Sequence, residues 1–152
     1  MRIGRICSKD VMGVGPQDTV SRATQLMREN HVGVVVVQED GRPVGIVTDR
    51  DIAIRTGGLR SAVADIPVSE VMSTQVMTVS ADDDVCVALE RMREFGVRRL
   101  PVINEGGYLA GVVSLDDIVQ HVSRLMKRIG EVFQSEFANE ARYDAGETDA
   151  AS

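Results

Sequence analysis

The chain has 152 residues, 43% of them hydrophobic, and a formal net charge of −6, which suits a compact domain with a buried core. Aromatic residues make up only 3% and no basic stripe runs along the sequence, so nucleic-acid binding is not expected. No apolar run approaches the length of a membrane-spanning helix, and we expect no membrane insertion.

Neither the cysteines nor the histidines form a metal-binding pattern. Cys7 and Cys86 are the only cysteines, and His31 and His121 are isolated from each other and from both thiols. A structural zinc site normally needs four such ligands with local pairing. We therefore expect two reduced thiols, no metal and no required cofactor. The N-terminus leads into polar residues without an apolar signal core, which indicates a cytoplasmic protein.

The first sixty residues predict a mixed motif of helices and strands. Asp18 follows a turn and is predicted to be the N-cap of a helix that ends near His31. The apolar run 32–37 is rich in β-branched residues and predicts a strand buried on both faces. Residues 44–47 predict the antiparallel strand after a hairpin turn. A second helix is expected to begin near Thr48.

The same order returns in the second half, where Asp83 or Asp84 is the predicted cap of a helix, 97–103 and 108–113 predict strands, and another helix opens at Ser114. Three blocks recur: Asp10-Val11-Met12 as Glu70-Val71-Met72, Val20-Ser21-Arg22-Ala23 as Val85-Cys86-Val87-Ala88, and Gly45-Ile46-Val47-Thr48 as Gly111-Val112-Val113-Ser114. A unit of sixty residues buries too little surface alone, so the two copies are expected to share a core.

The two copies are predicted to differ before their first helix. Gln75–Ser80 predicts a short strand in the second copy. In the first copy, Met12-Gly13-Val14 takes the place of Met72–Val79, so this strand is expected to be missing there. This shortening is the largest departure that we expect between the halves.

Beyond Asp117 the pattern predicts one long helix. Its apolar stripe comprises Ile118, Val122, Leu125, Met126, Ile129, Val132 and Phe133. The stripe fits a helix packed on its own domain and a contact with a partner subunit equally well. After Ala138 the sequence is polar, acidic and small, which predicts disorder. We divide the chain into a first motif at 1–60, a second at 61–126, and a helix end with an acidic tail at 127–152.

A hydroxyl and a carboxylate stand three residues apart at both strand-to-helix junctions: Thr48 with Asp51, and Ser114 with Asp117. Such a pair can simply cap its helix, with the acid returning a hydrogen bond to the cap's N–H. A helix N-terminus also favours phosphate, and a carboxylate can accept hydrogen bonds from a ribose diol. Because the pair recurs at equivalent positions, a ligand site is the second interpretation of these residues.

At these blocks the chain resembles the CBS-domain family, named after the regulatory region of cystathionine β-synthase and usually found as a tandem pair. The resemblance covers residues from about 8 to 124. It is carried by Asp10-Val11-Met12, Glu70-Val71-Met72, the capped helices, 97–102 and the two Gly-x-Val-[Thr/Ser]-x-x-Asp blocks. It implies an α+β fold in which two βαββα motifs pack sheet to sheet across a pseudo-twofold axis, and it implies a homodimer.

The resemblance also implies clefts that bind adenosyl ligands, namely AMP, ADP or ATP and sometimes NAD or S-adenosylmethionine. Asp51 and Asp117 would then hold ribose hydroxyls, and Thr48 and Ser114 would meet phosphate. Arg98 and Arg99 would aim at phosphate, although neighbours in a strand point to opposite faces and only one is expected to reach it. Their alternative role is ordinary surface charge. Ile46 and Val112 would line the base, and Thr78 and Val79 would offer backbone groups to its edge.

The first copy has Gly33 and Val34 where Arg98 and Arg99 stand, and it is expected to lack the equivalent of Gln75–Val79. We therefore expect one competent site per chain rather than two. The function implied is a regulatory module that senses an adenine nucleotide and signals to an unidentified partner protein. The alternative is a ligand-free interaction module with capped helices. An enzyme is not expected, because the chain has neither a P-loop nor a nucleophile–base set.

Overall fold

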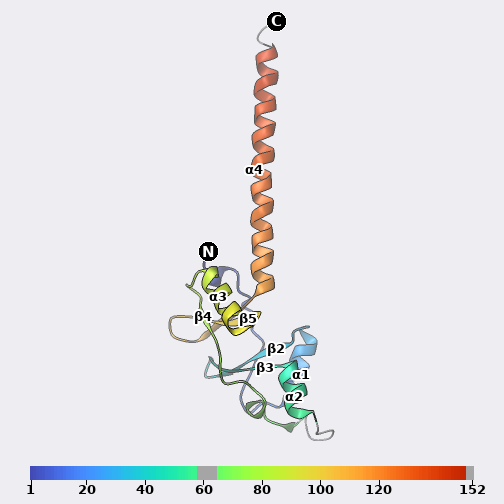
Figure 1. Ribbon diagram of the computed structural model, residues 1–152, viewed down its shortest axis with the longest axis vertical. Coiled ribbons are helices and arrows are strands. Elements are labelled where there is room, and N and C mark those ends of the chain that lie inside the picture. The colour runs from blue at the N-terminus through green and yellow to red at the C-terminus, as the bar shows by residue number, and fades with distance from the viewer. Residues whose placement is uncertain (58–64, 150–152) are drawn as a thin grey trace. The chain divides into compact units, whose positions relative to one another are not determined.

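The computed structural model describes residues 1–57 and 65–149 and contains two compact units, Met1–Leu115 and Asp116–Ser152. The first unit holds two three-stranded sheets, with strand orders β1-β2-β3 and β4-β5-β6 (Figure 1). The predicted α+β class with two βαββα motifs and an extended last helix is thus confirmed. The boundary between these two compact units falls at the start of that helix.

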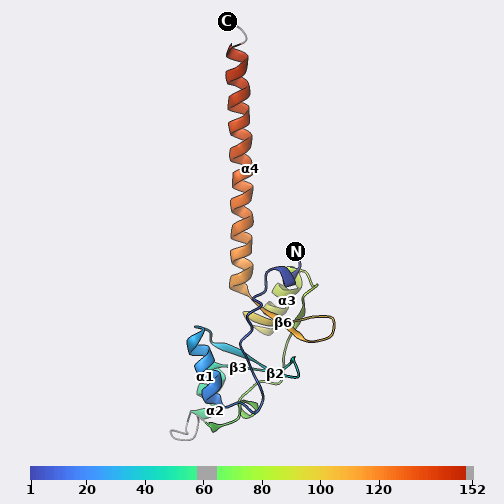
Figure 2. The same cartoon turned by 180° about the vertical axis from the view of Figure 1, so that it is seen from behind.

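The first motif runs through β1 (Gly13–Val14), α1 (Val20–Glu29), β2 (Val34–Glu39), β3 (Arg42–Thr48) and α2 (Asp49–Thr56). Strand β1 pairs in parallel with β2, and β2 pairs antiparallel with β3. Helices α1 and α2 contact each other and lie beside this sheet in both views (Figures 1 and 2).

The second motif repeats the order with β4 (Val79–Ser80), α3 (Val85–Phe95), β5 (Arg99–Ile103), β6 (Leu109–Ser114) and α4 (Leu115–Asp149). Strand β4 is parallel to β5, and β5 is antiparallel to β6. Two short 3-10 helices, η1 (Ile3–Arg5) and η3 (Val68–Glu70), open the two halves.

The helix caps follow one scheme in both motifs. Thr19 is the N-cap of α1 and accepts a hydrogen bond from the Arg22 N–H, so the prediction of Asp18 as the cap was wrong by one residue. Asp18 instead accepts from the Gly15 N–H at 2.7 Å and closes the preceding turn. In the second motif Asp84 is the N-cap of α3, and Asp83 closes the turn by accepting from the Ser80 N–H at 2.9 Å.

Each motif receives its opening segment from the other half of the chain. The Ile3 N–H donates to the Asp83 carbonyl at 3.0 Å, and the Val68 N–H donates to the Asp18 carbonyl at 2.8 Å. Residues 1–8 therefore pack on the second motif, while 66–73 pack on the first. This reciprocal exchange joins the motifs by backbone hydrogen bonds, as the shared core required.

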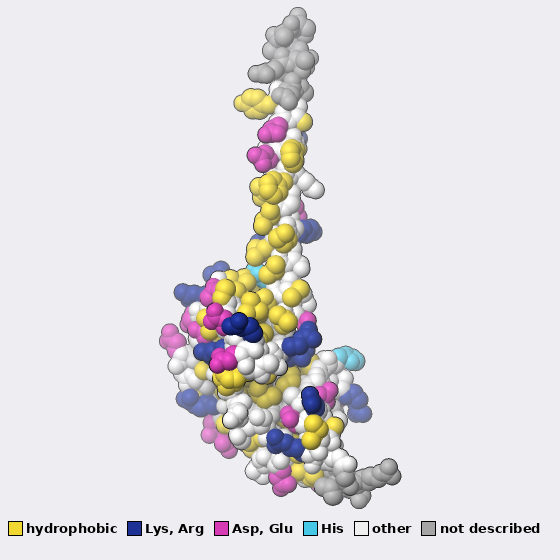
Figure 3. All heavy atoms as spheres, viewed as in Figure 1, with side chains coloured by type: hydrophobic (Ala, Val, Ile, Leu, Met, Phe, Trp, Pro, Cys, Tyr) yellow, Lys and Arg dark blue, Asp and Glu magenta, His cyan; other side chains and the backbone are white. Residues whose placement is uncertain are grey.

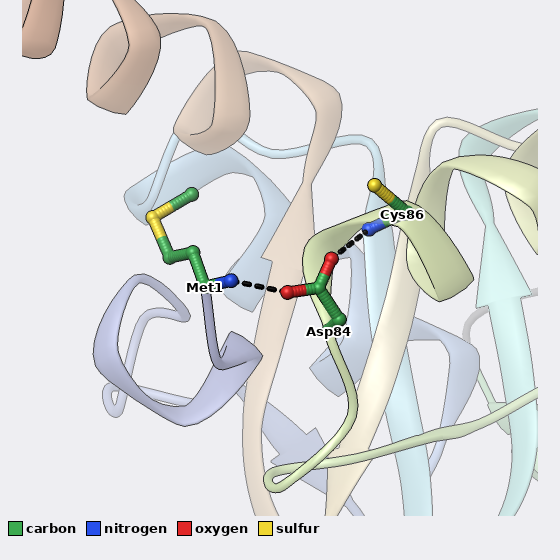
Figure 4. Close-up of polar contacts among 3 residues, drawn as sticks. All are labelled: Met1, Asp84 and Cys86. Carbon is green, nitrogen blue, oxygen red and sulfur yellow. Dashed lines mark hydrogen bonds and ion pairs between the residues drawn. The ribbon is translucent and has the colours of Figure 1, made fainter.

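The Met1 amino group adds an ionic contact to this exchange (Figure 4). It pairs with the carboxylate of Asp84, which also accepts a hydrogen bond from the Cys86 N–H at 3.0 Å. Together the ammonium hydrogen bond and the backbone hydrogen bond lower the pKa of Asp84 from its ordinary 3.8 to about 2. The hydrogen bond with Asp84 in turn raises the pKa of the Cys86 thiol.

The exchange corrects the predicted alignment of the two copies. Ile3 and Val68 occupy equivalent places, so the repeat keeps an offset of 65 residues through the opening segments. The match of Asp10-Val11-Met12 with Glu70-Val71-Met72 was a coincidence of residue type. No segment is missing from the first copy: β1 is the expected strand, and Val14 pairs with Val37 as Val79 pairs with Val102.

The core of the first motif is aliphatic and forms where the exchanged segment meets α1 and the strands. Its buried members are Val14, Val20, Ala23, Leu26, Met27, Val35, Val37, Val47, Val68 and Val71. In the second motif, Val79, Ala88, Met92, Leu100, Val102 and Val113 are buried at equivalent positions. Burial of these side chains is the main term that holds the repeat together.

Helix α4 continues through the tail that was predicted to be disordered. It extends from Leu115 to Asp149, because the tail contains strong helix formers such as Ala, Glu and Arg beside its acidic residues. Among residues 1–57 and 65–149, no helix is long and apolar enough to cross a membrane.

Candidate functional site

The first strand-to-helix junction forms a complete capping box. The Thr48 hydroxyl accepts from the Asp51 N–H at 3.0 Å and donates to Asp51 Oδ2 at 2.8 Å. The Thr48 N–H also donates to Oδ2, at 3.0 Å. The capping interpretation is therefore confirmed here. The capping box occupies only one oxygen of the Asp51 carboxylate, because both bonds go to Oδ2 and none of the described residues donates to Oδ1.

Asp49, the first residue of α2, stands where an anion would approach this helix. Its N–H donates to the Gly33 carbonyl at 3.1 Å, and its own Oδ1 accepts from the Arg50 N–H at 2.7 Å. A Cβ at Gly33 would lie 3.1 Å from Asp49 Oδ2, so the carboxylate covers that glycine. The Asp49 carboxylate thus takes the Arg50 N–H at the start of the helix and repels a second anion.

The second junction has the same backbone and different charges. The Leu115 N–H donates to the Arg98 carbonyl at 2.9 Å, which repeats the bond between Asp49 and Gly33. Leu115 therefore replaces Asp49, and Arg98 replaces Gly33. The buried Ser114 ends β6 and pairs across the sheet with Arg99. An apolar residue and two arginines stand here in place of a carboxylate and two uncharged residues.

The sequence predicted that Arg98 and Arg99 lie in one strand, and this prediction was wrong. Arg99 is the first residue of β5, and Arg98 lies in the turn before it. Both are exposed. Asp117 follows as the third residue of α4 and matches Asp51 in its place on the helix. Arg98, Ser114 and Asp117 each have interactions of their own.

The residues predicted to line the base are contacted by the exchanged segments. Ile46 and Ser73 bond each other's backbone, with N···O distances of 3.0 and 2.8 Å. Val112 and Ser8 repeat this at 3.0 and 2.9 Å. Both Ile46 and Val112 are partly exposed. Residues 66–73 therefore border the strand of Ile46, and residues 1–8 border the strand of Val112.

Close packing explains the glycine that opens each Gly-x-Val block. A Cβ at Gly111 would lie 2.6 Å from the Ser8 carbonyl oxygen, and a Cβ at Gly45 would lie 2.5 Å from Met72 Sδ. Real Cβ atoms do not approach other atoms so closely, so both glycines admit the exchanged segment. Their recurrence in the sequence reflects this packing.

Thr78 and Val79 lie on the approach to β4. The Thr78 carbonyl already accepts a hydrogen bond from the Arg91 guanidinium, and the Val79 side chain is buried. The first motif has the same segment: the Val11 N–H donates to the Lys9 carbonyl as the Val76 N–H donates to that of Thr74, both at 3.0 Å. Gly13 and Val14 are thus the counterparts that sequence reasoning missed.

Sequence reasoning also missed Ser8, Ser73 and Asp49. The serines carry no motif, and only the constant offset of 65 could have revealed them as a pair. The replacement of Asp49 by Leu115 at the equivalent position of the second copy could be read from the sequence. The importance of Asp49 depends on its contact with Gly33, a residue far away in sequence.

A model of the CBS domain family matches residues 3–55 and 68–124. The two matches begin at Ile3 and Val68, the residues that open the exchanged segments. The chain is 34% identical over 130 residues to Uncharacterized protein MK0525 of Methanopyrus kandleri, which covers 85% of this chain and 66% of that relative. The chain belongs to the CBS domain family and contains a tandem pair.

Solved structures share this fold. The CBS-domain containing protein ATU1752 from Agrobacterium tumefaciens superimposes with a TM-score of 0.69 and 29% identity, covering 80% of this chain and 98% of that one. The CBS domain pair of MJ0100 superimposes with a TM-score of 0.70 and 20% identity, covering 81% of this chain and 96% of that one. At that identity, the likeness to MJ0100 shows the fold alone.

Proposed function

We propose that this chain is a regulatory module that binds an adenosyl ligand through its second motif, with the phosphate held near Arg98, Arg99 and Ser114. The observation that carries the proposal is the difference in charge between the two equivalent strand-to-helix junctions. In the first motif the Asp49 carboxylate accepts a hydrogen bond from the Arg50 N–H at the start of the helix. In the second motif the uncharged Leu115 stands at the equivalent position. A phosphate is attracted by guanidinium groups and repelled by a carboxylate.

The remaining contacts follow the positions of the family motif. Asp117 would accept the ribose hydroxyls, Val112 would line the base, and Thr78 and Val79 would meet its edge. In the first motif Ile46, Thr48 and Asp51 hold the same positions, and Oδ1 of Asp51 leaves room for one ribose hydroxyl. That site would suit an adenosyl group without phosphate better than a nucleotide.

One solved structure supports adenosyl chemistry in this fold. The CBS domain pair of MJ0100 was crystallised with 5'-methylthioadenosine and S-adenosyl-L-methionine. Neither ligand carries a phosphate, so this structure supports recognition of the adenosyl group alone. AMP, ADP, ATP and NAD are the phosphate-bearing candidates for the second motif of this chain.

The exchanged segments suggest how binding would be signalled. Ser8 belongs to the first half of the chain and borders Val112 of the second motif. A ligand beside Val112 would thus touch both halves and favour the arrangement in which they fit it. The equilibrium moves only by the difference in binding free energy between the two arrangements. We propose a cytoplasmic homodimer that passes this change to a regulated protein, without catalysis.

One observation favours a second candidate, a ligand-free interaction module. The capping box of Thr48 and Asp51 is complete without any ligand. In this case the repeated hydroxyl–carboxylate pairs serve only as helix caps. The modules would then hold a partner protein in place rather than sense a nucleotide.

Thermal unfolding of the full chain with AMP, ATP, NAD, S-adenosylmethionine and adenosine separates the two candidates. A ligand at 100 times its dissociation constant adds about 2.7 kcal/mol to the free energy of unfolding. We expect the largest stabilisation from a phosphate-bearing compound and its loss in the Arg98→Ala/Arg99→Ala variant. Arg93→Ala, an exposed arginine on α3, is the matched control. No stabilisation by any of the five compounds would support the interaction module.

A further inference from the structure

The hairpin turns of the two motifs meet at their tips. The first turn joins β2 to β3 at Asp40 and Gly41, and the second joins β5 to β6 through residues 104–108. The Leu109 N–H donates to the Gly41 carbonyl at 2.8 Å. A Cβ at Gly41 would lie 3.3 Å from the Tyr108 ring. The two motifs are therefore joined a second time, by residues that do not belong to the exchanged segments.

An arginine stacks on an aromatic ring at this contact. The guanidinium carbon of Arg42, the first residue of β3, lies 4.5 Å from the centroid of the Tyr108 ring. A guanidinium at this distance is attracted by the negative face of the ring. A Cβ at Gly107 would lie 2.5 Å from Arg42 Nη1, so this glycine leaves room for the guanidinium.

The second turn positions Tyr108 for this contact. The side-chain oxygen of Asn104 accepts hydrogen bonds from the N–H groups of Gly106 and Tyr108, at 3.0 Å each. The Asn104 N–H donates to the Tyr108 carbonyl, also at 3.0 Å. Both backbone groups of Tyr108 are thus bonded within their own turn, and its ring needs little further ordering to meet Arg42.

The contact between the turns is exposed, whereas the exchanged segments are buried. Figure 3 shows hydrophobic side chains on the surface of both units, and Tyr108 of the first unit is 47% exposed. Arg42 is exposed as well. Ile3 and Val68, which open the exchanged segments, are 0% exposed. An exposed cation–π pair changes an equilibrium constant only about two- to fivefold, so this contact opens more easily than a buried one.

We propose that the stacked pair of Arg42 and Tyr108, together with the bond between Leu109 and Gly41, forms a latch between the motifs. This hairpin latch opens locally while the exchanged segments keep the motifs joined. Strands β3 and β6 begin at the latch and lead to the two strand-to-helix junctions, so its opening frees the starts of both strands. The inference goes beyond the proposed function and does not depend on any ligand, because it names the contact that releases one hairpin from the other.

Native-state hydrogen exchange of the full chain, followed by NMR in low concentrations of urea, tests whether the latch opens locally. The Leu109 amide exchanges only when its bond to the Gly41 carbonyl is broken. We expect its rate to be nearly independent of urea, because a local opening exposes little new surface. The amides of Ile3 and Val68 should exchange more slowly and accelerate steeply with urea. A Leu109 amide that follows Ile3 and Val68 in both respects would overturn the latch.

Substitution of the arginine tests whether the stacked pair holds the latch. Arg42→Gln removes the charge and lies far from Leu109 in sequence, so it leaves the intrinsic exchange rate of that amide unchanged. We expect the Leu109 amide to exchange about two- to fivefold faster in this variant. Arg22→Gln removes an exposed arginine of α1 and should keep the parent rate. An unchanged rate in Arg42→Gln would overturn the latch as proposed.

Substitutions of Tyr108 separate the ring from the hydroxyl. Tyr108→Phe keeps the ring and should keep the parent rate, whereas Tyr108→Leu should match Arg42→Gln after correction for the intrinsic rate of the neighbouring amide. Tyr108→Leu combined with Arg42→Gln should exchange no faster than either single variant, because both changes remove the same interaction. Additive acceleration would show that the two side chains act separately, and it would overturn the stacked pair.

Discussion

A Cβ on Gly111 would lie 2.6 Å from the Ser8 carbonyl oxygen, because the first residues of the chain cross the second motif at this glycine. We expect Gly111→Ala to lower the free energy of unfolding by about 1–3 kcal/mol, since a backbone atom must move to admit the methyl group. Gly45→Ala should cost less, because the nearest atom there is the flexible end of Met72. Urea unfolding measures both. Equal losses would show that the exchanged segment yields easily.

Gly130 offers the opposite control. It lies in α4 with nothing within 4 Å of a built Cβ, so Gly130→Ala removes only the conformational cost of a helical glycine. We expect the helix to be stabilised by about 1 kcal/mol. Thermal melting followed by circular dichroism should show higher helix content. A loss of helix would mean that another surface covers Gly130 in solution.

The capping box at Thr48 predicts a small and specific loss of stability. Thr48→Ala removes the hydroxyl that accepts from the Asp51 N–H and should cost about 1 kcal/mol. Thr48→Ser keeps that oxygen and should stay close to the parent. Urea unfolding of the three proteins checks the order. If serine were as damaging as alanine, the methyl group rather than the cap would be responsible.

The charge difference between the junctions predicts an asymmetric response to mutation. Asp117→Ala should weaken binding of an adenosyl ligand by more than Asp49→Ala, since only Asp117 is assigned to a ribose. Asp49→Leu removes the repelling carboxylate and should raise the affinity of the first motif for a phosphate-bearing ligand, but this site should stay the weaker one because Gly33 and Val34 replace the two arginines. Isothermal titration calorimetry reports both results as affinity and stoichiometry. Equal losses at Asp117 and Asp49 would refute the ribose assignment.

The low pKa of Asp84 predicts acid sensitivity. Its carboxylate titrates at about 2 in the folded chain and ordinarily at 3.8, so the folded state binds fewer protons between these values. The stabilisation is fully present above about pH 4 and is lost as the pH falls toward 2. Asp84→Asn should therefore unfold more easily than the parent at pH 6 and equally easily near pH 2. Glu90→Gln, an exposed change on the same helix, should show no such convergence.

The same contact predicts slow chemistry at Cys86, because the hydrogen bond with Asp84 and the negative charge raise the pKa of its thiol. Asp84→Ser keeps a residue that can cap α3 and removes the charge. Alkylation of Cys86 by iodoacetamide at pH 8 should then proceed faster, since the thiolate is the reactive form. Peptide mapping separates this site from the buried Cys7. Unchanged rates would show that access rather than ionisation limits the reaction.

The local elements were predictable because their signals are local. The spacing of Val20, Ala23 and Met27 marked α1, and the hydroxyl–carboxylate spacing marked the start of α2. The run of β-branched residues marked β2 within two residues of its observed ends. The family resemblance, carried by the two Gly-x-Val blocks, was confirmed over both motifs. Errors appeared where one residue had to be chosen among neighbours, as with Asp18 and Thr19.

The sequence by itself determined that this protein is a duplicated βαββα pair with a long final helix, because periodicity and capping depend on residues within one or two turns of each other. The tertiary structure alone decided which segments of the copies correspond, since hydrogen bonds between Ser8 and Val112 and between Ser73 and Ile46 join residues far apart in sequence. It also decided what the Asp49 carboxylate does at the start of α2. That role depends on Asp49 lying over Gly33, a residue at the beginning of β2 that the fold brings beside α2.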